Sequence, residues 1–123
     1  MAGPTDGFED QDQLMYDVVT TLIANARRVG RAAIEEAATH GLDPVVQVTT
    51  GLTTETEAIV AGIDPANVPL VSAVEAAGRA ITAVAVQALR TGVQPPAEAL
   101  DRALDLFSSY ITGPGRSRIL GLS

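Results

Sequence analysis

Apolar residues recur every three or four positions in separate stretches of this chain, and Gly or Pro lies in every gap between the stretches. In the first stretch, residues 12–40, the recurring residues are Met15, Val19, Leu22, Ala26, Val29, Ala33 and Ala37. Such steps place all of them on one face of an α-helix, and a strand cannot keep that period. Residues 68–91 repeat the spacing with Leu70, Val74, Ala77, Ile81, Val84 and Ala88, and residues 96–112 repeat it again. The sequence therefore predicts an all-α fold.

The second stretch, residues 44–62, is less regular. Asp43 and Pro44 fit the cap and first turn of a helix, but residues 45–54 are rich in β-branched side chains, which favour strands. One helix, a strand, and a helix broken at Gly51 and restarted at Thr54 all remain open. We favour one helix, because strict alternation of apolar and polar residues fails at Val45 and Val46, while one helical face collects the apolar residues Val45, Val48, Leu52, Ile59 and Ile63. The prediction is an up-and-down four-helix bundle with helices at about 12–40, 44–62, 68–91 and 96–112.

Charge is distributed unevenly along the chain. The formal net charge is −7, and five acids with no arginine precede residue 18. We expect residues 1–11 to be a disordered acidic arm, residues 12–112 to be the bundle domain and residues 113–123 to be a linker with an apolar tail. An acidic chain without a basic stripe is not expected to bind nucleic acid.

Membrane insertion and secretion are also not expected. The longest uncharged run, residues 44–54, is far shorter than the roughly 20 residues that span a bilayer, so no transmembrane segment is predicted. The first residues lack the basic start and apolar stretch of a secretory signal. The cytoplasm is the expected location.

Few residues suit catalysis. Cysteine is absent, which excludes thiolate nucleophiles, disulfides and cysteine-ligated metals. The single histidine, His40, follows Glu36 by one turn, but a histidine in the last turn of a helix also interacts favourably with the helix end. The Glu-x-x-His spacing of metal-binding bundles is not met. We predict no catalytic residue, metal site or cofactor, and an enzyme that uses Glu36, His40 or one of the arginines is the least favoured hypothesis.

The basic cluster Arg27, Arg28 and Arg31 lies opposite the apolar face of the first helix. Glu35 follows Arg31 by four residues and is expected to pair with it. The cluster is interpreted either as a solvated helix face with local ion pairs, which we favour, or as a contact for an anion or an acidic partner.

The last two predicted helices each carry a second apolar stripe beside the first. One stripe buries a helix in a bundle, whereas two imply a further neighbour. We therefore predict a homo-oligomer whose interface contains Val71, Leu89, Ala99, Ala103, Leu106 and Tyr110. The alternative is that both helices are central in a compact monomer.

The tail that follows Gly113, Pro114 and Gly115 is apolar, with Ile119, Leu120 and Leu122. Because disordered ends are normally polar, we expect the tail to fold back onto the bundle or to dock into a groove on another subunit or protein. Packing on the chain's own oligomer is favoured. The favoured function is a non-catalytic assembly, adaptor or scaffold protein. The alternative is a carrier or sensor of an apolar small molecule.

Overall fold

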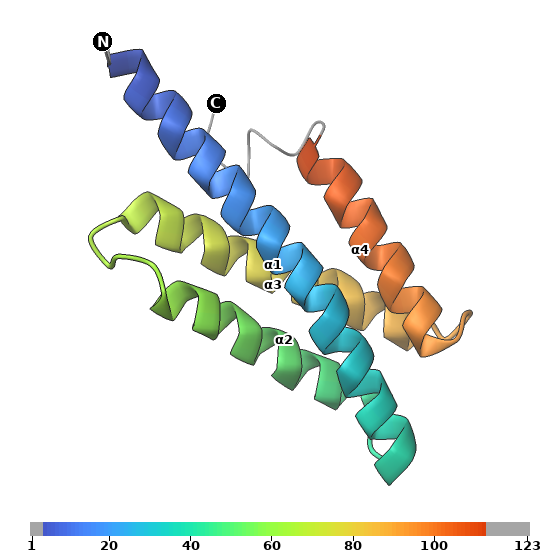
Figure 1. The fold of residues 1–123 in the computed structure, drawn as a ribbon. Coiled ribbons are helices and arrows are strands. Elements are labelled where there is room, and N and C mark those ends of the chain that lie inside the picture. Colours follow the sequence, from blue (N-terminus) through green and yellow to red (C-terminus); the bar gives the residue numbers. More distant parts are fainter. Residues whose placement is uncertain (1–3, 113–123) are drawn as a thin grey trace.

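The computed structural model describes residues 4–112, with side chains from 11 to 111, and shows an up-and-down four-helix bundle. The helices are α1 (Pro4–His40), α2 (Pro44–Ala61), α3 (Val68–Thr91) and α4 (Pro96–Thr112). Helix α1 contacts each of the other three, and α3 lies between α2 and α4 (Figure 1). The predicted all-α class is confirmed.

Glycine ends α1 and α3, as the sequence predicts. Gly41 and Gly92 have φ angles of 65° and 66°, in the left-handed region that glycine adopts without strain. The amide of Leu42 donates to the carbonyl oxygen of Ala37 at 2.8 Å, which closes α1 with the hydrogen bond of a Schellman motif. The chain therefore reverses sharply and starts the next helix within a few residues.

Helix α2 is continuous through Gly51, which settles the three alternatives in favour of one helix. Its N-cap is Asp43, whose carboxylate accepts a hydrogen bond from the amide of Val45 at 2.9 Å. Val48 and Leu52 are 0% and 2% exposed. Burial of this helical face outweighs the strand preference of the β-branched residues.

Helix α1 begins at Pro4, eight residues before the predicted start. The backbone of residues 4–11, which the sequence analysis assigns to a disordered arm, is thus helical. Proline suits the first helical position because its φ is fixed near the helical value and its missing N–H is not needed there. At 1.5 Å per residue α1 is roughly 55 Å long, and its N-terminal end projects beyond the other helices (Figure 1).

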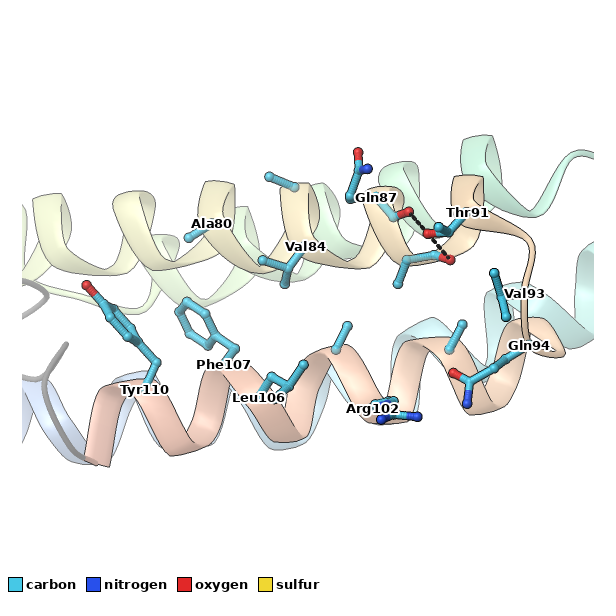
Figure 2. Close-up of a pocket in the computed structure, with 14 residues that line it drawn as sticks. Ala80, Val84, Gln87, Thr91, Val93, Gln94, Arg102, Leu106, Phe107 and Tyr110 are labelled. Carbon is cyan, nitrogen blue, oxygen red and sulfur yellow. Dashed lines mark hydrogen bonds between the residues drawn. The ribbon is translucent and has the colours of Figure 1, made fainter.

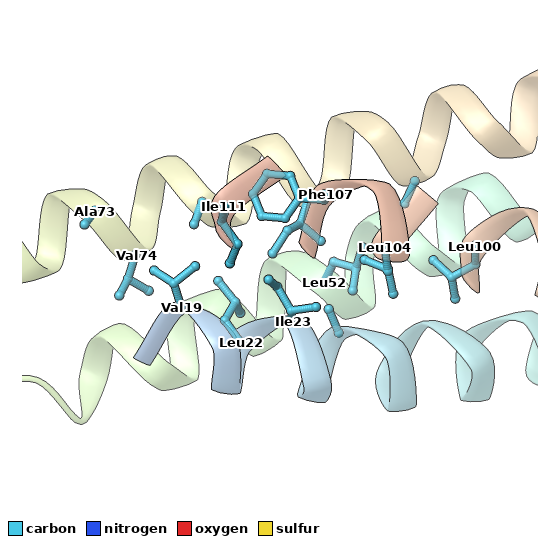
Figure 3. Close-up of a cluster of buried hydrophobic side chains, with 14 of the residues drawn as sticks. Val19, Leu22, Ile23, Leu52, Ala73, Val74, Leu100, Leu104, Phe107 and Ile111 are labelled. Atoms are coloured by element: carbon cyan, nitrogen blue, oxygen red, sulfur yellow. The ribbon is translucent and has the colours of Figure 1, made fainter. Parts of the chain in front are cut away.

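The core is mostly aliphatic, with the ring of Phe107 among its side chains, and receives side chains from all four helices (Figure 3). No buried polar or charged side chain is present in the part of the chain whose side chains the structure describes. Removal of apolar surface from water therefore supplies the main driving force for packing. The largest fully buried residues are Leu22, Leu52, Ile81, Leu100, Leu104 and Ile111.

Two glycines bring helices unusually close together. A Cβ on Gly78 of α3 would lie 2.9 Å from Cβ of Thr56 on α2 and closer still to its γ atoms, and a Cβ on Gly30 of α1 would lie 2.6 Å from Leu100 of α4. Both distances are far below van der Waals contact. Because these two residues have no side chain, Thr56 of α2 packs directly against α3, and the end of the Leu100 side chain packs directly against α1.

Helix α3 is the one helix between residues 4 and 112 that is long and apolar enough to cross a membrane by length and composition. The sequence analysis expects no such segment. The core helix of a bundle has the same properties, and the apolar face of α3, with Leu70, Val74 and Ile81, is buried against its neighbours.

Candidate functional site

An open groove of about 990 Å³ lies between α3 and α4 (Figure 2). Val84 projects from α3, and the rings of Phe107 and Tyr110 project from α4 towards α3. Val93 and Gln94 of the connecting loop lie at one end, and Tyr110 lies at the other. The lining is mostly apolar, and its single charged side chain is Arg102.

The groove leaves large apolar side chains in water. Val93 is 83% exposed, Leu106 67%, Tyr110 39% and Val84 36%. These are four of the eight exposed large hydrophobic residues among those that the structure describes. Full burial of one such side chain contributes about 1.5–3 kcal/mol. A concave surface of this kind gains stability when something covers it.

The structure separates the predicted interface residues into two groups. The first group lines the groove: Leu106 and Tyr110 are exposed there, and Ala99 and Ala103 are buried, at 4% and 7% exposure.

Val71 and Leu89 do not line the groove. Both are half-buried, and Leu89 packs against the core. Conversely, Val84, which the sequence analysis places in the core stripe of its helix, lines the groove. The spacing identifies a wide apolar surface on α3 but not which part of it a neighbour covers.

A second groove, of about 610 Å³, lies between α2 and α3 and is more polar. Its charged lining residues are Glu57, Glu75 and Arg79, and Thr53, Thr56 and Thr82 add hydroxyl groups. None of the predicted site residues lines it.

Arg27 and Arg31 of the basic cluster pair with acids on α4. Arg27 contacts the carboxylate of Asp101 at 3.0 Å and that of Asp105 at 2.5 Å, and Arg31 Nε donates to Asp101 Oδ1 at 3.1 Å while its Nη2 pairs with Oδ2. The hydrogen bond from Arg31 lowers the pKa of Asp101, which partial burial opposes, and a second bond from Arg27 lowers it further. The same bond from Arg31 raises the pKa of Arg31 itself.

These pairs change the interpretation of the cluster. Arg31 pairs across the helix interface with Asp101 rather than with Glu35 on its own helix, so that expectation is corrected. The positive charges of two of the three arginines are thus balanced by aspartates on α4. Arg28 is exposed, and it forms no ion pair with any residue whose side chain the structure describes.

His40 and Glu36 approach each other on the surface of α1, with 3.3 Å between His40 Nε2 and Glu36 Oε1. Their side chains are 57% and 59% exposed, and neither lines either groove. Within the described part of the chain no three His, Asp or Glu residues are placed to hold a metal ion. This pair therefore lacks the concave surroundings that a catalytic site requires.

The predicted docking residues Ile119, Leu120 and Leu122 lie outside the described residues.

Comparison with known proteins gives no match to a protein-family model, to a curated protein or to a solved structure. The α3–α4 groove is the strongest candidate site.

Proposed function

We propose that this chain is a non-catalytic assembly or adaptor protein that associates with copies of itself through the α3–α4 groove. The observation that carries the proposal is the concentration of exposed apolar side chains there, with Leu106 at 67% exposure. A paired carboxylate, a metal cluster or a convergent polar set would favour chemistry, whereas a nearly uncharged groove favours packing.

The near absence of charge in the groove and its small side chains suit a symmetric dimer. In a two-fold interface the same surface is used on both protomers, so like charges at its centre would face each other. With Arg102 as the single charged lining residue, the α3–α4 groove avoids most such repulsion. Small side chains such as Ala80 and Ala88 on α3 allow another helix to approach closely.

Sedimentation equilibrium tests this function on the whole chain and on a chain ending at Thr112. We expect self-association at concentrations up to several hundred micromolar, and we expect Leu106→Glu to abolish it because it places a charge in the apolar interface. Val46→Glu is the matched control, since Val46 is 53% exposed on α2 and lies outside the groove. The mass of a single protomer for both chains at every concentration refutes the proposal. Equal loss of self-association in Leu106→Glu and Val46→Glu also refutes it.

The groove's volume supports a second candidate function, a carrier or sensor of an apolar small molecule. About 990 Å³ falls at the upper end of the range of ligand pockets, roughly 300–1,000 Å³. Isoprenoids or fatty acids would then raise the unfolding temperature by binding the folded state. Ala88→Leu, which fills part of the groove, should remove that rise. No shift with any apolar ligand excludes the carrier.

A further inference from the structure

The groove begins near the end of α4, and residues 113–123, which include Ile119, Leu120 and Leu122, follow α4 in the sequence. Tyr110 marks this end of the groove, two residues before α4 stops at Thr112, and Val93 marks the far end (Figure 2). A chain that leaves α4 therefore reaches the groove only by reversing its direction.

The sequence that follows α4 suits a reversal. Pro114 and Gly115 are the residue types preferred at the second and third positions of a type II turn, because proline fixes φ and glycine accepts a positive φ. A turn between Gly113 and Arg116 would direct the following residues back along α4.

The segment is long enough to cover the groove. From Thr112, where α4 ends, the helix rises roughly 9 Å back to Leu106 and roughly 20 Å back to Ala99. Counted from Arg116, where the turn ends opposite Gly113, Leu120 and Leu122 lie four and six residues further on, which is roughly 13 Å and 20 Å in an extended chain. Its apolar residues therefore come level with Leu106 and the alanine floor of the groove.

The chemistry of the two surfaces also matches. Residues 119–123 carry no charged side chain and include three aliphatic ones, and the groove has one charged lining residue, Arg102. Such a segment buries apolar surface without leaving a charge unpaired. A short linker also gives a millimolar effective concentration, which exceeds that of a second copy in a micromolar solution.

We propose that residues 119–122 occupy the α3–α4 groove of their own chain. The docking itself follows from the groove and the segment, whereas its effect on assembly rests on the proposed function. In the isolated protomer the segment covers Leu106, and self-association requires the segment to leave. Concentration then decides between the covered protomer and the assembled form.

Because the chain has no cysteine, an engineered pair reports the docking directly. In the full chain, Leu106→Cys with Leu120→Cys should form a disulfide within one chain under mild oxidation at low micromolar concentration, because the docked residues come within disulfide range. The matched control is Asp105→Cys with Leu120→Cys, since Asp105 neighbours Leu106 but pairs with Arg27 on α1. We expect the control to react at least about tenfold more slowly. Equal rates of disulfide formation in the two variants overturn the proposal. A disulfide between Cys at positions 106 and 120 that forms only between chains also overturns it.

Truncation after Thr112 measures the consequence for assembly. If the covered state is favoured about tenfold, a dimer that uses two grooves is weakened about a hundredfold in the full chain. The truncated chain should therefore self-associate about a hundredfold more tightly in sedimentation equilibrium. Equal or weaker association of the truncated chain contradicts the covering role. If both chains stay monomeric, the proposed function fails, and the cysteine pairs alone decide the docking.

Discussion

The close approach of α2 and α3 at Gly78 can be tested by adding a single methyl group. In Gly78→Ala the new Cβ would lie 2.9 Å from Cβ of Thr56 and closer still to its Cγ2 and Oγ1. Rotation of Thr56 about χ1 moves only the γ atoms, so the contact with its Cβ remains. The two helices must therefore separate locally.

The expected loss follows from two opposing effects. Overpacking of a tight helix contact costs about 1–3 kcal/mol, and three contacts this short place Gly78→Ala near the upper end. Alanine stabilises a helix by about 1 kcal/mol relative to glycine. We expect a net loss of about 2 kcal/mol in the free energy of unfolding, which lowers the melting temperature by roughly 8 °C in a chain of this size.

Urea and thermal unfolding followed by circular dichroism measure this loss. Gly62→Ala is the matched control, because Gly62 has a φ of −85° and a Cβ there would approach the carbonyl oxygen of Ile59 no closer than 3.5 Å. It should be neutral or stabilising by up to about 1 kcal/mol. Adding Thr56→Ala to Gly78→Ala should restore part of the stability, with a coupling of about 0.5–3 kcal/mol. A Gly78→Ala chain as stable as the parent refutes the reasoning.

Three further predictions concern the core, the ion pairs and a helix cap. Leu104→Ala should cost about 3 kcal/mol in urea unfolding because Leu104 is 0% exposed, whereas Val46→Ala, at 53% exposure and outside the groove, should cost less than about 1 kcal/mol; similar losses would contradict the assigned burial. The folded-state pKa of Asp101 is lowered, so its carboxylate stabilises the fold above the unfolded value of about 3.9 and loses that effect as the pH falls through the folded value. The melting-temperature difference between the parent and Asp101→Asn should therefore be present at pH 7 and vanish in strong acid, and a difference constant with pH refutes this. Asn67→Ala removes the acceptor that caps α3 and should cost about 1 kcal/mol in urea unfolding, more than Gln11→Ala, which removes only the side-chain partner of Asn67; equal costs would contradict the capping role.

The helix boundaries are largely predictable from the sequence because glycine and proline act locally. Gly41 and Gly92 adopt positive φ at the ends of their helices, and Pro96 starts α4. The residues between them follow the helical period, which depends only on neighbours along the chain. The start of α1 is the exception, because the acidic composition of residues 1–11 suggests disorder although Pro4 suits a helix start.

The candidate site is only partly predictable, because its geometry depends on contacts between distant residues. A helical period shows that α4 has a wide apolar surface, and the structure places Leu106 of that surface in the groove. It does not show that Leu89 packs against the core while Val84 lines the groove. Similarly, Arg31 has an acid four residues away in sequence, but Asp101, 70 residues away, is its partner in the structure.

The glycine contacts at Gly30 and Gly78 also determine how the helices are aligned along their lengths. Sliding α3 by one turn would carry Val74 or Thr82 to the place of Gly78, where Thr56 of α2 now packs. Sliding α1 by one turn would carry Ala26 or Ile34 to the place of Gly30, where Leu100 of α4 now packs. These shifts are therefore sterically unfavourable, although the aliphatic core residues are alike in chemistry. In a protein with no buried polar side chain from residue 11 to 111, the two glycine contacts favour the observed alignment of the helices along their lengths.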